Sequence, residues 1–412
     1  MLGTFIQKSA IVLRPYLPTG GQATSYLVSI NVSLSPIIFF NFPKNTIMRF
    51  ETAAIHGGQI NTDSHQPVVQ PLTLSTNFVH HEGSLIYSRA ANPNRLALES
   101  LLAKLEKGEA AAAFSSGNAA GMAVFQALAP GSHIIAPDDM YHGLRKQLTT
   151  IFTGILEVSF VDMTVVDNIK NAIKENTKLL WLETPSNPLL KITDIRAACA
   201  QVEGQEIKIV VDNTFATPVF QNPFDLGADI VMHSATKYFG GHSDILGGAL
   251  ITKVKDVFWE KIKNVHETGG AVPSPFDCYY LVRSIKTLAY RMKGHAEHAG
   301  IIATYLNLHD KVEAVYYPGL VTHPGHDIAA SQMTGFGGMM SFLYKGSAEE
   351  TDQFISKLKF FTNATSLGGV ESLIERRAAV EGPDSKTPPN LVRLSVGLEH
   401  LDDLLEDLDK AL

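Results

Sequence analysis

Strand-like and helix-like segments alternate through the middle of the chain. Short apolar runs predict strands at 132–137, 156–161, 178–183, 207–212 and 229–233. Apolar residues three or four positions apart predict helices at 95–107, 140–152, 165–175 and 195–202, and a further helix that ends near residue 129. Thr164 and Asp194 are the expected N-caps of the helices at 165 and 195. This alternation predicts an α/β fold in which helices cover both faces of a parallel sheet.

The pattern changes towards both ends of the chain. After Pro273, a long amphipathic helix is expected from about 277 to 306. A smaller mixed domain follows, with expected strands at 340–344 and 391–396 and expected helices at 349–357 and 401–408. Residues 53–95 are rich in Gly, Pro, His and Asn without a clear period, which predicts an extended arm.

The first 47 residues differ from the rest in composition. Positions 1–50 contain no Asp or Glu, and their basic residues are Lys8, Arg14, Lys44 and Arg49. A transit-type presequence is one interpretation of such a segment. Because arginine is sparse, we favour an upstream extension that precedes a functional start at Met48. No apolar run in it is long enough to span a bilayer.

Composition narrows the class of protein. A chain of 412 residues with 45% hydrophobic and 18% charged residues is typical of a soluble protein with two or three structural units. A net charge of -7 gives no reason to expect nucleic acid as a partner. Cys199 and Cys278 have no metal-site spacing and cannot form a disulfide framework, so a reducing, cytoplasmic setting fits best. The fifteen histidines show no ligand spacing, and we expect no metal.

The candidate chemistry centres on a lysine that follows one of the predicted strands. Lys237 comes shortly after Ser234 and Thr236 and just before the glycine pair 240–241. A lysine amine forms a Schiff base with the aldehyde of pyridoxal phosphate (PLP), and nearby hydroxyls bind its phosphate. Upstream, Asp212 ends another predicted strand, where a carboxylate can hold the pyridine nitrogen protonated. Each residue alone could be a surface lysine or a helix cap, but together they favour a PLP site.

Other residues add to this constellation, each with an ordinary alternative. Ser116 and Gly117 precede a predicted helix, whose first N–H groups suit a phosphate, although an ordinary cap is as good an explanation. Tyr141 could stack on a cofactor ring or pack in the core. Asn187 could donate to a substrate carboxylate or form an Asx-turn. Arg393, inside an apolar strand, needs a carboxylate partner, either a substrate α-carboxylate or a structural Asp or Glu.

Together these segments closely resemble the Cys/Met-metabolism (trans-sulfuration) family of PLP-dependent enzymes. The resemblance runs from about Met48 to Leu412. It rests on Tyr87-Ser88-Arg89, Ser116-Gly117, Tyr141, Glu183-Thr184-Pro185-Ser186-Asn187-Pro188, Asp212-Asn213-Thr214, Ser234-Ala235-Thr236-Lys237, Gly241-His242-Ser243-Asp244, Ser366-Leu367-Gly368-Gly369 and the strand holding Arg393. It implies PLP fold-type I, as in aspartate aminotransferase, with a mostly parallel central sheet, helices on both faces, an N-terminal arm and a smaller α/β C-terminal domain.

The resemblance also implies a role for each matching residue. Lys237 would be the Schiff-base lysine and proton shuttle, Asp212 the partner of the pyridine nitrogen, and Tyr141 the residue stacked on the ring. The phosphate would be held by Ser116, Gly117, Asn118, Ser234 and Thr236, with Tyr87 and Arg89 reaching the phosphate of a neighbouring subunit. The substrate carboxylate would be oriented by Asn187, Ser366 and Arg393.

The implied organisation is a homotetramer built from two dimers with shared active sites. Residues 1–47 would be an extension of uncertain status and 48–90 an arm that contributes to the neighbouring subunit. Residues 91–290 would form the large PLP-binding domain and 291–412 the C-terminal domain. We expect a small amino-acid substrate, and neither nucleic acid nor membrane as a partner.

The expected activity is trans-sulfuration, with γ-elimination of L-cystathionine as the leading hypothesis. The family also contains cystathionine γ-synthases and O-acylhomoserine sulfhydrylases, which carry out γ-replacement, and cystathionine β-lyases. Gly143 stands where methionine γ-lyases typically have cysteine, which argues against that activity. Ile86 and Thr365 stand where animal-type cystathionine γ-lyases carry glutamate, which leaves room for O-acylhomoserine substrates.

Hypotheses from other classes fit the sequence less well. A fold-type I aminotransferase shares the lysine and aspartate but lacks the segments 87–89 and 366–369. An inactive PLP-binding relic would be expected to lose Lys237, Asp212 or Arg393, and all three are present. A nicotinamide dehydrogenase would need Gly-x-Gly-x-x-Gly after an early strand, and the segment 335–340 fails at its last glycine.

Overall fold

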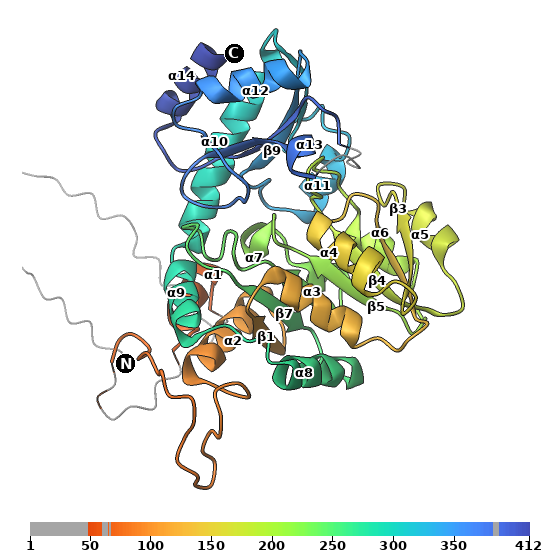
Figure 1. The fold of residues 1–412 in the computed structure, drawn as a ribbon, viewed down its shortest axis with the longest axis vertical. Coiled ribbons are helices and arrows are strands. Elements are labelled where there is room, and N and C mark those ends of the chain that lie inside the picture. The colour runs from red at the N-terminus through yellow and green to blue at the C-terminus, as the bar shows by residue number, and fades with distance from the viewer. Residues whose placement is uncertain (1–47, 60–64, 66, 382–386) are drawn as a thin grey trace, which may run out of the picture. The chain divides into compact units, whose positions relative to one another are not determined.

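The computed structural model describes residues 48–59, 65, 67–381 and 387–412 (Figure 1). Its central sheet has seven strands. The strands are β1 (Ala110–Phe114), β2 (His133–Pro137), β3 (Glu157–Val161), β4 (Thr177–Glu183), β5 (Lys208–Asp212), β6 (Ile230–His233) and β7 (Gly248–Thr252). Their order is β1-β7-β6-β5-β4-β2-β3. The neighbours from β6 to β3 pair in parallel, and β7 is antiparallel to both β6 and β1. The predicted α/β class with a mostly parallel sheet is confirmed.

Helices cover both faces of this sheet because its strands are apolar on both sides. Along β4, Leu180 and Leu182 pack on one face, with residues of α2 (Pro93–Glu106), α6 (Ile195–Ala200) and α9 (Pro275–Ile285). Leu179 and Trp181 pack on the other face, with α3 (Gly117–Gln126), α4 (His142–Lys146) and α8 (Val257–Gly269). Alternate residues of one strand therefore belong to two separate cores, as expected for a doubly covered parallel sheet. Shorter elements complete this part: α5 (Asp167–Ala172), α7 (Thr217–Phe220) and a 3-10 turn (Pro223–Leu226).

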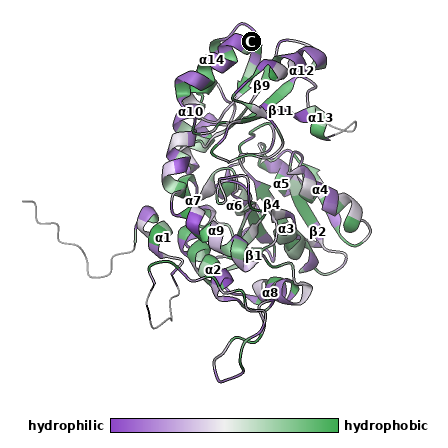
Figure 2. Ribbon diagram, turned by 60° about the vertical axis from the view of Figure 1, so that its left-hand side comes forward, coloured by the Kyte–Doolittle hydropathy of each residue, from purple (hydrophilic) through white to green (hydrophobic). Residues whose placement is uncertain are grey.

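A second sheet lies in the C-terminal part of the chain. It has the order β10-β11-β12-β9-β8, with β8 (Val312–Tyr316), β9 (Met339–Tyr344), β10 (Thr362–Asn363), β11 (Leu373–Arg376) and β12 (Leu391–Ser395). Its core also contains residues of α10 (Leu288–Leu308), α12 (Ala348–Lys357) and α14 (Leu401–Ala411). Figure 2 shows hydrophobic and hydrophilic residues side by side on α12 and α14, as expected for helices with one buried side. Two further helices of this part are α11 (His326–Gln332) and α13 (Arg377–Glu381).

Several local predictions were wrong, each for a physical reason. The helix expected from 277 to 306 is broken between α9 and α10 at Thr287, whose backbone is not helical. At this break the Ser284 carbonyl accepts hydrogen bonds from the Thr287 hydroxyl (3.1 Å) and from Arg291 Nη2 (3.0 Å). Thr164 does not cap α5, because its N–H and its hydroxyl both donate to Asp162 Oδ1. The predicted cap Asp194 is confirmed, since its carboxylate accepts from the N–H of Ala197 at 2.9 Å.

The segment predicted as an extended arm is irregular over much of its length. It begins with a short helix, α1 (Phe50–His56), which the sequence pattern did not predict. Beyond this helix, an isolated β-bridge joins Asn77 to Tyr87. Val68, Val79 and Ile86 are strongly exposed, with 82%, 83% and 65% of their surface accessible. The expected extension at 1–47 lies outside the described residues, and the domain limits at 90 and 290 stay predictions.

Candidate active site

One pocket is lined by the functional residues that were predicted for the large domain and for the C-terminal part of the chain. It has a volume of about 390 Å³ and lies at the C-terminal ends of β4, β5 and β6. Its lining includes Ser116, Gly117, Asn118, Tyr141, Asn187, Asp212, Ser234, Thr236, Lys237, Ser366 and Arg393. Ligands of α/β folds bind at this edge of a parallel sheet.

Lys237 is held between the two parts of the chain. Its Nζ donates a hydrogen bond to the Ser366 hydroxyl over 2.8 Å. Burial, with a smaller contribution from the positive charge of Arg393, lowers the pKa of Lys237 from 10.5 to about 8. The neighbouring Thr236 is fixed by an exchange of hydrogen bonds with Gly247, accepting from its N–H at 3.0 Å. With this lowered pKa, a substantial fraction of the lysine is a free amine at about pH 8, well below the pH at which an exposed lysine loses its proton.

Ser366, the partner of Lys237, has an uncommon backbone conformation. Its φ is +106°, a region that residues other than glycine rarely adopt. The strained residue still makes two contacts in the pocket, since its hydroxyl accepts from Lys237 and its carbonyl accepts from Arg393 Nη2 at 3.1 Å. Backbone strain of this kind persists where surrounding contacts over-determine it, often at functional sites.

Two carboxylates end neighbouring strands at the floor of the pocket. Asp212 of β5 and Glu183 of β4 are direct partners in the sheet register. Burial raises the pKa of both carboxyl groups, and for Glu183 the nearby Asp212 adds to this effect. Glu183 accepts a hydrogen bond from the Tyr141 N–H at 2.8 Å, which fixes the start of α4 and so the position of the tyrosine. Asp212 accepts from the Thr214 N–H at 3.0 Å and forms no ion pair with any described residue.

The start of α3 forms one wall of the pocket. The Ser116 hydroxyl caps this helix by accepting from the N–H of Ala119 at 3.1 Å. Gly117 approaches Ser234 so closely that a Cβ atom at position 117 would lie 2.9 Å from Ser234 Oγ. Position 117 therefore requires glycine. Its absence of a side chain brings the positive end of the helix and the Ser234 hydroxyl to the same part of the pocket, where they can bind an anion.

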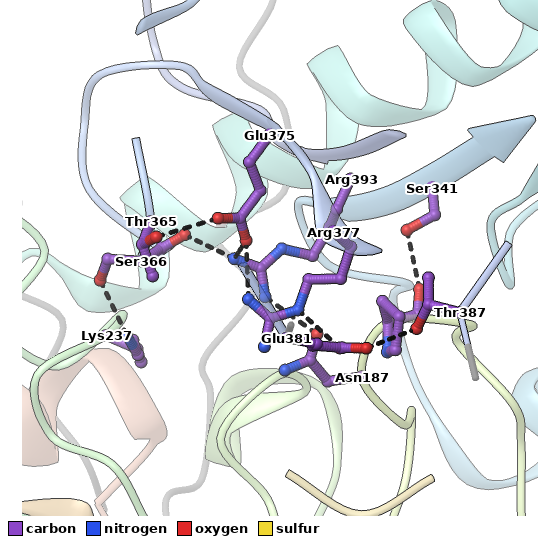
Figure 3. A network of polar contacts seen from close by, with 11 residues as sticks. Asn187, Lys237, Ser341, Thr365, Ser366, Glu375, Arg377, Glu381, Thr387 and Arg393 are labelled. Atoms are coloured by element: carbon purple, nitrogen blue, oxygen red, sulfur yellow. Dashed lines mark hydrogen bonds and ion pairs between the residues drawn. The ribbon is translucent and has the colours of Figure 1, made fainter. Parts of the chain in front are cut away.

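Arg393 of β12 is buried and lies in a network of polar contacts (Figure 3). Its Nη1 donates to Asn187 Oδ1 at 2.9 Å, and its Nη2 forms an ion pair with Glu375. Glu375 Oε1 also pairs with Arg377 Nη1 at 3.0 Å, and Oε2 accepts from the Thr365 hydroxyl at 3.1 Å. The sequence analysis required a carboxylate partner for Arg393, and in the structure Glu375 provides one.

A second buried polar cluster supports the strands beneath the pocket. Glu106, at the end of α2, is fully buried, and its Oε1 lies 2.5 Å from His233 Nε2. The same oxygen accepts from Asn213 Nδ2 at 3.0 Å. His233 and Asn213 flank Ser234 and Asp212 in sequence, so this cluster positions the ends of β5 and β6. Sequence reasoning missed Glu106, because nothing in its amphipathic helix distinguishes it from a solvated acid.

Two predicted cofactor-binding residues lie apart from the others. Neither Tyr87 nor Arg89 belongs to the lining of the pocket. Instead, Arg89 Nη1 donates to the carbonyl of Glu267 at 2.6 Å, and its guanidinium lies 5.6 Å from the centre of the Tyr87 ring. Tyr87 is 44% exposed.

The donor set of the pocket fits PLP. Asp212, a buried carboxylate that pairs with no cation in the described part of the chain, suits a protonated pyridine nitrogen. The approach of Gly117 to Ser234 leaves N–H and hydroxyl donors for a phosphate. An amine with a lowered pKa, Lys237, suits reaction with an aldehyde. The described residues contain no cluster of three His, Cys, Asp or Glu that could hold a metal ion. None of the described helices has the length and apolar character needed to cross a bilayer.

Comparison with known proteins gives a consistent result. A family model described as Cys/Met metabolism PLP-dependent enzyme matches residues 51–412. Cystathionine gamma-lyase of Dictyostelium discoideum is 44% identical over 375 residues, covering 88% of this chain and 97% of that protein. Cystathionine gamma-synthase of Mycobacterium tuberculosis H37Rv is 44% identical over 373 residues, covering 88% and 96%.

Solved structures agree with the sequence comparison. The crystal structure of metB from Corynebacterium glutamicum matches with a TM-score of 0.86 at 42% identity, covering 89% of this chain and 98% of that one. Both the extent of the family match and the identity to full-length relatives confirm the resemblance inferred from the motifs. The chain therefore belongs to the Cys/Met metabolism family of PLP-dependent enzymes.

Proposed function

We propose that this enzyme catalyses γ-elimination of L-cystathionine, which with water gives L-cysteine, 2-oxobutyrate and ammonia. One observation carries the proposal: the amine of Lys237 lies in the same pocket as Arg393, and Ser366 contacts both. A base and a carboxylate-binding cation held together in this way suit proton abstraction next to the carboxylate of an amino acid.

Residues of the large domain would hold the cofactor. Asp212 would pair with the pyridine nitrogen, and Tyr141, at the start of α4, would lie against the ring. The phosphate would be bound by Ser116, Gly117, Asn118, Ser234 and Thr236. When bound, PLP supplies an electron sink that stabilises negative charge at the substrate Cα.

Lys237 would move the protons of the reaction. Its lowered pKa makes a neutral amine available near pH 8, which can take the proton from Cα of the substrate. A leaving group at Cγ requires a second proton transfer, from Cβ, and the same amine would perform it. The Ser366 hydroxyl, 2.8 Å from Nζ, would hold the amine in place while it acts on these two positions.

Arg393 and Asn187 would bind the substrate carboxylate. Arg393 is buried and makes its hydrogen bond to Asn187 at 2.9 Å, so both side chains converge on one point of the pocket wall. A guanidinium forms strong, charge-assisted hydrogen bonds with a carboxylate. This would orient Cα and its proton toward Lys237.

γ-Replacement on an O-acylhomoserine is the second candidate. The observation that favours it is Thr365, which lines the pocket and whose hydroxyl donates to Glu375 at 3.1 Å. This part of the wall therefore carries a hydroxyl where animal-type lyases are expected to have a carboxylate. A thiol would then form a C–S bond at Cγ, and the acyloxy group would leave as a carboxylate.

The active unit is proposed to be at least a dimer, and the full assembly a homotetramer. Tyr87 and Arg89 lie outside the pocket of their own subunit, which supports a role in the phosphate site of a neighbour. The exposed apolar residues of the arm, Val68, Val79 and Ile86, support its burial against another subunit. We also infer a cytoplasmic location, supported by the free thiols of Cys199 and Cys278.

The test is to incubate the PLP-loaded enzyme with L-cystathionine and identify the 2-oxo acid by mass. 2-Oxobutyrate with cysteine is the expected result. Pyruvate with homocysteine would instead indicate β-elimination. If no oxo acid forms, O-acyl-L-homoserine with a thiol is the next substrate pair, and formation of the thioether would establish γ-replacement.

A further inference from the structure

The wall of the pocket holds two charged side chains that the proposed reaction does not use. Among its charged lining residues, Lys237, Arg393, Asp212 and Glu183 already have roles in the chemistry or in positioning Tyr141. Arg377 and Glu381 remain. They face the pocket as a cation and an anion side by side.

The two residues are placed together by one turn of helix. Arg377 begins α13, directly after β11, and Glu381 is four residues further along the same helix. Residues at this spacing lie on one side of a helix. Arg377 Nε pairs with Glu381 Oε1 at 3.0 Å, and the side chains are only 6% and 14% exposed.

This pair is joined to the proposed carboxylate site through Glu375. Glu375 Oε1 contacts Arg393 Nη2 on one side and Arg377 Nη1, at 3.0 Å, on the other (Figure 3). The two guanidinium groups are therefore neighbours in one pocket wall. Arg377 Nη2 makes no hydrogen bond to another described residue, which leaves it as a donor for a ligand.

We propose that Arg377 and Glu381 determine specificity by binding a second amino-acid group at the far end of the substrate. Arg377 binds the distal carboxylate, and Glu381 binds the distal ammonium. A cation and an anion side by side match the two charges of a zwitterion. The inference rests on the proposed function and deepens it, because L-cystathionine carries such a group on its γ-sulfur.

Three substrates with different distal groups separate the two contacts. L-Cystathionine carries a distal zwitterion, O-succinyl-L-homoserine a distal carboxylate alone, and O-acetyl-L-homoserine no distal charge. The quantity compared is kcat/KM for each substrate divided by kcat/KM for O-acetyl-L-homoserine. This division removes any effect that a variant has on Arg393 through Glu375, since all three substrates share the α-carboxylate.

Glu381→Gln keeps an oxygen that can accept from Arg377 but loses the negative charge. It is expected to lower the ratio for L-cystathionine by roughly tenfold to a hundredfold, and to leave the ratio for O-succinyl-L-homoserine unchanged or raised. Arg377→Gln is expected to lower both ratios by a similar factor, and Arg377→Lys to restore part of each. Asp352→Asn is the matched control, because it removes an ion pair with the adjacent Arg376 at 2.7 Å, away from the pocket lining.

Binding is measured in parallel through the change in cofactor absorbance when each substrate is added, which requires no product. Ratios that stay within twofold of wild type in Glu381→Gln and Arg377→Gln would overturn the inference and assign the pair a purely structural role. If wild-type enzyme forms no oxo acid from L-cystathionine yet its binding weakens selectively in Glu381→Gln, the proposed reaction fails and the distal site stands. If L-cystathionine neither binds nor reacts, both the proposed reaction and the proposed distal site are refuted.

Discussion

The Lys237 amine donates to the Ser366 hydroxyl over 2.8 Å, although 129 positions separate the two residues in the sequence. Lys237 follows a strand of the central sheet, whereas Ser366 precedes β11 of the second sheet. The proposed base is therefore positioned by both parts of the chain. Its chemistry depends on how the second sheet packs against the first.

Replacing Lys237 by alanine is expected to abolish turnover, because it removes the proposed base and the amine that reacts with the cofactor aldehyde. The yellow absorbance of lysine-bound PLP should disappear as well, while the circular dichroism spectrum stays that of a folded protein. Lys253→Ala is a suitable control, since Lys253 Nζ donates to the Phe224 carbonyl at 3.1 Å and does not line the pocket. Substantial activity in Lys237→Ala would refute the assignment of the site.

The lowered pKa of Lys237 predicts a pH-dependent stability in the cofactor-free protein. Between pH 8 and 10.5 the unfolded chain keeps the lysine proton that the folded chain has lost, so this residue's contribution to stability rises with pH. The destabilising effect of the buried charge, at most about 3 kcal/mol, is thus complete below pH 8 and fades above it. Lys237→Met should accordingly stabilise the cofactor-free protein at pH 7.

Urea unfolding of the cofactor-free wild type and Lys237→Met at pH 7, 8.5 and 10 measures this effect. The difference in free energy of unfolding should favour the variant most at pH 7 and shrink at each higher pH. A difference that is constant across the three pH values would show that the folded-state pKa of this lysine is not lowered.

Glu375→Gln is expected to destabilise the protein by about 3 to 5 kcal/mol, because it leaves the buried guanidinium groups of Arg393 and Arg377 without their shared anion. Asp352→Asn breaks the more exposed pair with Arg376 and should lower the free energy of unfolding by less than about 1 kcal/mol. Chemical denaturation of both variants provides the comparison. Equal effects would mean that Glu375 has no special part in the network.

Tyr87→Phe and Arg89→Ala are expected to weaken retention of PLP, because both residues would reach the phosphate of a neighbouring subunit. The measurement is cofactor occupancy after extended dialysis, together with the molecular mass in solution. Arg196→Ala serves as control, since this arginine also donates to a backbone carbonyl, that of Asp225 at 3.2 Å, but does not lie on the arm. Unchanged occupancy in Tyr87→Phe and Arg89→Ala would remove the argument for a shared site.

The sequence predicted those elements whose own pattern was sufficient to define them. Apolar runs that end on Glu183, Asp212 and His233 identified three parallel strands, with their polar ends at one edge of the sheet. β1 was missed because Ala110–Ala113 favours a helix on propensity alone, and the pairing with the antiparallel β7 decides otherwise. The helix predicted from 140 to 152 is α4 followed by a π-helical turn, Gln147–Ile151, an irregularity that no period reveals.

The residues of the site that local sequence patterns identify were also predicted. Lys237 and Asp212 follow strands in a recognisable order, and all predicted residues except Tyr87 and Arg89 line one pocket. Glu375 and Arg377 were missed, because Glu375 meets Arg393 only through the pairing of β11 with β12, and Arg377 joins them only through its contact with Glu375. An apolar segment followed directly by Glu375, Arg376 and Arg377 was the available signal, since such charges need partners if buried.

Glu375 and the three charges connected to it have a consequence for redesign of the enzyme. Arg393 and Arg377 carry two positive charges, and Glu375 and Glu381 carry two negative charges, in one connected set. A single neutralising replacement would leave a net charge beside the substrate carboxylate. A double replacement such as Arg377→Leu with Glu381→Leu would keep the set neutral, so engineering libraries should vary these positions together as well as singly.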